Sequence, residues 1–187
     1  MDCGGSIVAT KFVITAAHCM YDWYDNGVIF KKFVAQGIAI RIGEHDLNDI
    51  NGFGDTGIEE WRNIDQVYIH PLYPIKDKYM YKQMIEYEYD IAILELTEVI
   101  NLAKFTPACL PKVTDGTTFD GEKVRVAGWG RIPHKQFPQG GKYIETNLPY
   151  EVDLTVVENC QAWPQPCFLC AGFHDQGIKA TCSVSLI

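Results

Sequence analysis

Short runs of alternating apolar and polar residues fill this chain, and no segment keeps the apolar spacing of an amphipathic helix. The runs that predict strands with one face toward a core are 12–15, 36–43, 64–69, 123–127 and 151–156. The run 91–96 is more uniformly apolar, which predicts a strand that is more deeply buried. Many short antiparallel strands joined by irregular loops predict an all-β fold made of two antiparallel β-barrels, both incomplete at the chain ends.

The alternation weakens near the middle of the chain, where Pro107 and Pro111 appear, and we expect the chain to cross there from one half to the other. The predicted organisation is an N-terminal barrel over 1–105, a crossing over 106–121 and a partial C-terminal barrel over 122–187. Residues 21–30 are polar and aromatic, with an Asn-Gly turn signal, and read as a loop.

Composition excludes several classes of partner. Of the 187 residues 47% are hydrophobic, which is enough for a packed core. The net charge is −8 and there is no block of Lys or Arg, so we expect no nucleic acid and no anionic membrane surface as partner. No apolar run approaches the length needed to span a bilayer.

Seven cysteines in a strand-rich chain indicate an oxidising, extracellular setting. The odd number leaves at least one thiol without a partner inside the chain. Residues 1–3 lack the basic segment and apolar core of a secretory signal peptide. We therefore predict a secreted protein, although this chain shows no signal peptide.

Residues 13–19, Val-Ile-Thr-Ala-Ala-His-Cys, place a histidine just past an apolar, β-branched strand. An imidazole has a pKa suited to taking the proton of a hydroxyl nucleophile. Asp90 stands directly before the apolar run 91–96, where a carboxylate can accept the imidazole Nδ1 proton and fix the tautomer. The plain alternatives are a buried structural histidine at position 18 and a solvated acid at position 90.

With Cys3-Gly4-Gly5-Ser6 upstream and Gly128-Trp129-Gly130 downstream, these segments resemble the chymotrypsin/trypsin family of serine proteases, including its clip-domain type. The resemblance covers the chain from Cys3 to Ser183. It implies proteolysis by acyl-enzyme chemistry, with His18 as general base and Asp90 as the carboxylate that orients it. The implied partners are a protein or peptide substrate, or a protease inhibitor.

The family's nucleophile is missing from its expected place. In the family the serine lies within Gly-Asp-Ser-Gly-Gly, four residues after a cysteine that Cys182 resembles, and that place holds Leu186. Ser183 and Ser185 lack flanking glycines, so the oxyanion hole is absent too. We expect a fragment or truncated isoform of an endopeptidase, inactive as given; the alternative is a non-catalytic homologue that acts as a binding or regulatory protein. Ala180 stands where trypsin-like members carry the acid of the specificity pocket.

The resemblance also implies roles for the cysteines. Cys3 is the obvious partner of Cys19, and a loop of that size is worth roughly 3 kcal/mol of stability. Cys109 resembles the cysteine that tethers an upstream regulatory segment. The further predicted pair is Cys160–Cys170, while the pairings of Cys167 and Cys182 stay open.

A calcium loop is the one cofactor site that the resemblance suggests. Glu44 and Glu59 bracket a loop rich in Asp and Asn, and some family members bind calcium with two glutamates at such places. Oxygen ligands suit this hard cation. The plain alternative is an acidic, solvated loop. No other cofactor is expected.

Overall fold

The computed structural model describes residues 3–23, 29–32, 35–48, 58–73, 89–112, 119–133, 143–157 and 170–172. Its regular elements are twelve strands and two short 3₁₀ turns, with no α-helix in these ranges. The all-β class predicted from the alternation is therefore confirmed. Within the described part there is also no helix with the length and apolarity to cross a lipid bilayer.

The chain separates into two compact units. Unit 1 comprises Met1–Glu44 and Ile58–Leu110, and unit 2 comprises His45–Gly57 and Pro111–Ile187. Residues 45–48 are tied to unit 2 by two hydrogen bonds. The N–H of Leu47 donates to the carbonyl of Asn147 at 3.0 Å, and the indole Nε1 of Trp129 donates to the carbonyl of His45 at 3.1 Å.

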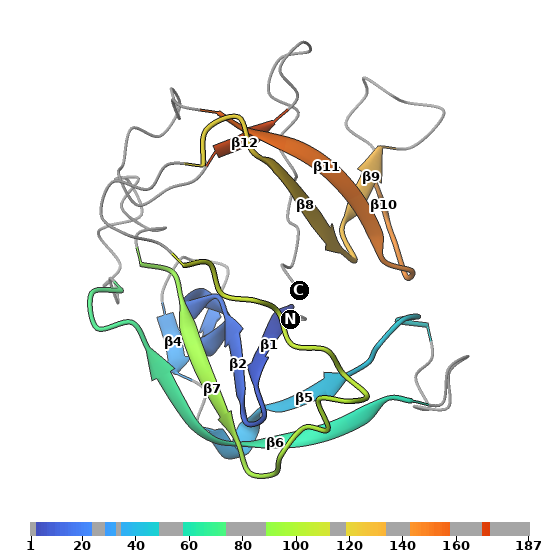
Figure 1. Ribbon diagram of the computed structural model, residues 1–187. Coiled ribbons are helices and arrows are strands. Elements are labelled where there is room, and N and C mark those ends of the chain that lie inside the picture. Colours follow the sequence, from blue (N-terminus) through green and yellow to red (C-terminus); the bar gives the residue numbers. More distant parts are fainter. Residues whose placement is uncertain are drawn as a thin grey trace. The chain divides into compact units, whose positions relative to one another are not determined.

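Unit 1 is built on one five-stranded antiparallel sheet (Figure 1). In spatial order its strands are β1 (Gly5–Ala9), β2 (Phe12–Thr15), β7 (Ala92–Leu96), β6 (Glu60–Ile69) and β5 (Ala39–Ile42). The two strands nearest in sequence form a hairpin, in which Gly5 pairs with Thr15. Strand β7 enters from far along the chain and pairs with β2, so that Thr15 lies opposite Ala92.

Strand β6 curls this sheet because it serves two partners along its length. Its first part pairs with β5 from Ile42 opposite Glu60 to Ala39 opposite Asn63. Its second part pairs with β7 from Ile64 opposite Leu96 to Ile69 opposite Ala92, with an irregularity after Ile64. An extra residue in a strand bends it and increases its twist. Figure 1 shows β6 curving as it passes from one partner to the other.

The inward face of the sheet forms the core of unit 1. Along β7 every second residue is buried, and Leu96 is fully enclosed. The deeper burial predicted for this strand holds for one face, while Ile93 on the opposite face is 39% exposed. The core members are Val13, Ala17, Met20, Tyr21, Ile42, Ile64, Tyr73, Ala92, Leu94, Leu96, Ile100 and Phe105.

Residues 21–30, predicted as a loop, contain regular structure. β3 (Tyr21–Trp23) pairs antiparallel with β4 (Ile29–Lys32), and the Asn-Gly signal falls between the two strands. An Asn-Gly dipeptide between two strands is the strongest short-range signal for a hairpin. The polar composition hid the hairpin, although Tyr21 is among the most completely buried side chains of the described residues.

Unit 2 contains a three-stranded sheet and a separate hairpin. The sheet has β11 (Tyr150–Val157) at its centre, flanked by β8 (Lys123–Gly128) and β12 (Cys170–Gly172). The hairpin pairs β9 (Arg131–Pro133) with β10 (Tyr143–Glu145). In β11 the alternating residues Leu154 and Val156 are buried, as the pattern of 151–156 predicted.

Candidate active site

His18 sits on a single 3₁₀ turn, η1 (Ala17–Met20), directly after β2. Ala16 keeps an extended backbone before the turn, and the N–H of Cys19 donates to its carbonyl at 3.2 Å. Ala17 and Met20 are buried in the core of unit 1 and anchor the turn to that core. Its small and apolar residues point inward and leave the imidazole of His18 46% exposed.

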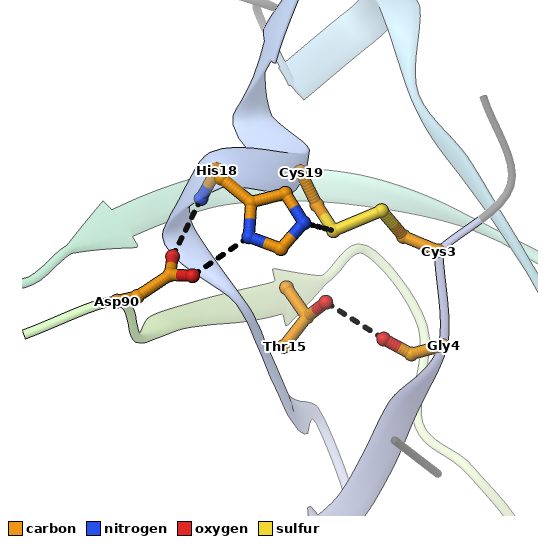
Figure 2. The surroundings of a disulfide bond; sticks show 6 residues. All are labelled: Cys3, Gly4, Thr15, His18, Cys19 and Asp90. Atoms are coloured by element: carbon orange, nitrogen blue, oxygen red, sulfur yellow. Dashed lines mark hydrogen bonds and ion pairs between the residues drawn. A yellow bond between two sulfur atoms is a disulfide. The ribbon is translucent and has the colours of Figure 1, made fainter. Parts of the chain in front are cut away.

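Asp90 binds His18 with both carboxylate oxygens, although the two residues lie 72 positions apart in sequence. The imidazole Nδ1 donates to Oδ2 at 2.7 Å, and the backbone N–H of His18 donates to Oδ1, also at 2.7 Å. Asp90 reaches this place because it precedes β7, which pairs with β2 in the sheet. The Asp90 side chain is mostly buried, at 15% exposure. Figure 2 shows both contacts.

The bound carboxylate changes the proton affinity of the imidazole. The hydrogen bond that His18 donates to Asp90 and the negative charge of that carboxylate raise the pKa of His18, while burial lowers it in part. A carboxylate at Nδ1 also fixes the tautomer, because the proton must lie on the nitrogen that faces it. The arrangement can therefore hold an imidazole as a base and stabilise it once it is charged.

The disulfide joins Cys3 to Cys19 beside this imidazole, with 6.2 Å between their Cα atoms. The Sγ of Cys19 lies 3.6 Å from the Nε2 of His18 (Figure 2). Gly5 lets β1 approach β2, because a Cβ there would lie 2.9 Å from a methyl carbon of Val13. The hydroxyl of Thr15 donates to the carbonyl of Gly4 at 2.8 Å, which closes the same corner. The sequence around Cys3 thus fastens the turn that carries the histidine.

Among the described residues, one group of three brings potential metal-ligand atoms together. Ligand atoms of Cys3, His18 and Cys19 lie within 4.8 Å of one another, but the two sulfur atoms are bonded together and hold no metal in that state. The predicted calcium ligands are Glu44 and Glu59. The Nη1 of Arg41 lies 2.5 Å from Oε2 of Glu44. To bind Glu44, calcium would have to displace the guanidinium of Arg41 from that oxygen. Calcium binding by Glu44 and Glu59 stays a prediction.

Several predicted positions lie outside the described residues: Cys160, Cys167, Ala180, Cys182, Ser183, Ser185 and Leu186. Cys170, at the start of β12, is disulfide-bonded. Its predicted partner, Cys160, lies outside the described residues. Cys109 is a free, exposed thiol.

Two residues that the sequence did not single out lie next to Asp90. The rings of His70 and Tyr89 stack with their centroids 4.7 Å apart. The available signal was the position of Tyr89 immediately before the carboxylate.

The family model described as Trypsin matches residues 1–183. Ovochymase-2 of Mus musculus is 31% identical over 188 aligned residues, which are 95% of this chain and 26% of that protein. Serine proteinase stubble of Drosophila melanogaster is 28% identical over 94% of this chain and 20% of its own. Venom serine protease 34 of Apis mellifera is 34% identical over 70% of this chain and 28% of its own. The chain spans between a fifth and a third of the length of these relatives.

Proposed function

Because the chain belongs to the trypsin family of serine proteases, we propose that His18 and Asp90 are the base and the orienting carboxylate of an endopeptidase site. The observation that carries this proposal is the double contact between them. Both oxygens of Asp90 lie 2.7 Å from nitrogens of His18, one on the ring and one on the backbone. A carboxylate that served only as a solvated surface acid would not need to bind both the ring nitrogen and the backbone nitrogen of His18.

In the proposed reaction His18 takes the proton of a serine hydroxyl while the serine oxygen bonds to the carbonyl carbon of a peptide. The imidazolium then gives that proton to the leaving amine as the C–N bond breaks. A water molecule releases the acyl group by the same steps. Asp90 keeps the Nδ1 proton in place throughout and stabilises the imidazolium, in agreement with the raised pKa of His18.

We propose that the serine is supplied by sequence outside residues 1–187. Ser183 and Ser185 are not flanked by glycine, and Leu186 holds the place expected for the nucleophile. The substrate class is a protein or peptide. We place the protein in an extracellular, oxidising setting, which the disulfides at Cys19 and Cys170 support. The exposed thiol of Cys109 is available for an upstream regulatory segment.

A second candidate function is favoured by the observation that Leu186 holds the place expected for the nucleophile. If Leu186 stands in the mature protein where the serine is expected, the chain is a non-catalytic homologue. It would bind protease substrates, inhibitors or cascade partners without cleaving them. Such a homologue would keep the His18–Asp90 geometry as an inherited feature.

Long-read sequencing of the transcript separates the two. We expect a reading frame in which Ser183 is followed by codons for Gly-Asp-Ser-Gly, within a longer message. The protein from that message should react with a peptidyl phosphonate that labels active serines, and its His18→Ala variant should not react. A message that always ends with Leu186-Ile187, together with a protein that the phosphonate never labels, would favour the binding homologue.

A further inference from the structure

Asp90 lies between two residues that both contact His70. On one side the rings of His70 and Tyr89 stack at 4.7 Å, with 9° between their planes. On the other side the backbone N–H of His70 donates to the carbonyl of Ile91 at 3.0 Å. Because His70 directly follows β6, the end of that strand contacts both neighbours of the carboxylate.

The backbone is sharply bent at the same point. Tyr89 has a φ of 55°, and among the described residues no other non-glycine residue has a positive φ. A bulky aromatic residue rarely adopts this left-handed conformation. The N–H of Ile91 donates to the carbonyl of Tyr89 at 2.7 Å, which closes a three-residue turn centred on Asp90. A strained residue of this kind persists only where its surroundings hold it, and such residues cluster at functional sites.

His70 is well placed to hold the turn, because it is itself anchored. Its Nδ1 accepts the backbone N–H of Leu72 at 3.2 Å, and its carbonyl accepts the N–H of Tyr73 at 2.9 Å. Tyr73 is buried and its ring lies 6.0 Å from that of Tyr21, the residue that follows η1. The contacts from His70 therefore lead back into the core beneath the turn that carries His18.

We propose that Tyr89 and His70 are positioning residues, whose ring stack keeps the turn at 89–91 bent so that both oxygens of Asp90 reach His18. The meaning of that pair for catalysis rests on the proposed function, but the positioning itself concerns geometry alone. Burial does not explain the arrangement, because Tyr89 is 40% exposed. An exposed tyrosine with no further role has little reason to occupy a strained conformation.

The experiment measures the pKa of His18 and the exchange rate of its backbone amide by NMR in the full chain. Tyr89→Ala removes the ring. We expect the pKa of His18 to fall by about half a unit or more, since an opposite charge within reach shifts a pKa by roughly one to three units. The His18 amide, which donates to Asp90, should exchange faster. Tyr89→Phe keeps the stack and should behave as the wild type. Tyr150→Ala, which removes an exposed tyrosine from unit 2, is the matched control.

Tyr89→Asn separates the ring from the backbone, because asparagine tolerates the left-handed conformation. We expect it to behave as Tyr89→Ala. If either of these variants keeps the wild-type pKa and amide exchange of His18, the ring stack does not position Asp90 and the proposal is overturned. If Tyr89→Ala loses the amide protection of β7, the same comparison is made at the other ring of the stack. There, His70→Phe keeps an aromatic ring and His70→Ala removes it. These readouts need no nucleophile, so a failure of the proposed peptidase activity leaves them interpretable.

Discussion

His18 presents two nitrogens to two different neighbours, a carboxylate at Nδ1 and a disulfide sulfur at Nε2. Of these two neighbours, only the negatively charged carboxylate can shift the pKa of the imidazole appreciably. Replacing Asp90 by Asn keeps the shape but removes the negative charge, so we expect the pKa of His18 to fall toward its ordinary value of 6.5. A ¹⁵N-edited titration of the imidazole measures this. Glu95→Gln, on β7, is a control that should leave the pKa of His18 unchanged. If the pKa of His18 is unchanged in Asp90→Asn, the contact between the two residues is absent in solution.

The same pair makes stability depend on pH with a definite sign. The pKa of His18 is raised in the folded state, so the pair stabilises the protein fully below the unfolded value of 6.5. This stabilisation is lost as the pH rises through the higher folded pKa. We therefore expect Asp90→Asn to reduce the free energy of unfolding more at about pH 6 than at about pH 9. Urea unfolding at both values measures it, and an equal reduction at both would contradict the assignment.

The positions of His18 and Asp90 could be predicted because His18 follows one apolar run and Asp90 directly precedes another. The contact at Nδ1 was expected, but the second contact, from the backbone N–H of His18 to Oδ1, could not be predicted, since it depends on how strands pair between residues 72 positions apart. The one signal for this pair in the sequence was that Tyr89 directly precedes Asp90, and nothing in the sequence pointed to His70. A ring stack and a left-handed backbone arise from the tertiary structure that brings the two segments together.

At the scale of elements, the end of β5 must pass close to the segment that follows β7. Gly43 has a φ of 77°, and a Cβ there would lie 2.7 Å from the ring of the buried Phe105. We expect Gly43→Ala to destabilise unit 1 by about 3 kcal/mol, through both the strained backbone and the clash. Amide exchange of the β5–β6 pair measures the loss.

Two other glycines separate these causes. Gly121 has a φ of 79° but no atom within 4 Å of an added Cβ, so Gly121→Ala should reduce the stability of unit 2 by only about 1 kcal/mol. Gly37 also has open space around it and no positive φ, and Gly37→Ala should have little effect. A loss at Gly43 no larger than at Gly121 would mean that Phe105 moves aside.

The elements that the sequence predicted well are those with enough residues to display alternation, such as β11. The hairpin of β9 and β10 was missed because each strand has three residues, too few to show a period of two. β7 was predicted to be more deeply buried than the other strands, but composition alone cannot tell whether both of its faces are covered. Its exposed Ile93 reflects packing that lies outside the local sequence.

At the scale of the whole molecule, the two units have separate buried residues. Unit 1 has the core that encloses Leu96, while in unit 2 Leu154 and Val156 are buried on β11. The disulfide between Cys3 and Cys19 lies wholly in unit 1. Its removal should therefore destabilise one unit and spare the other.

We expect the double variant Cys3→Ser, Cys19→Ser to lose roughly 3 kcal/mol of stability in unit 1, the loop-closure value for a sequence separation of 16. Native-state amide exchange measures this residue by residue, with Leu94 and Leu96 reporting on unit 1 and Leu154 and Val156 on unit 2. Cys109→Ser removes a free, exposed thiol and is the matched control, with no change expected in either unit. Equal losses at all four amides would mean that the two units unfold as a single cooperative block, because the constraint on one would then be felt in full by the other.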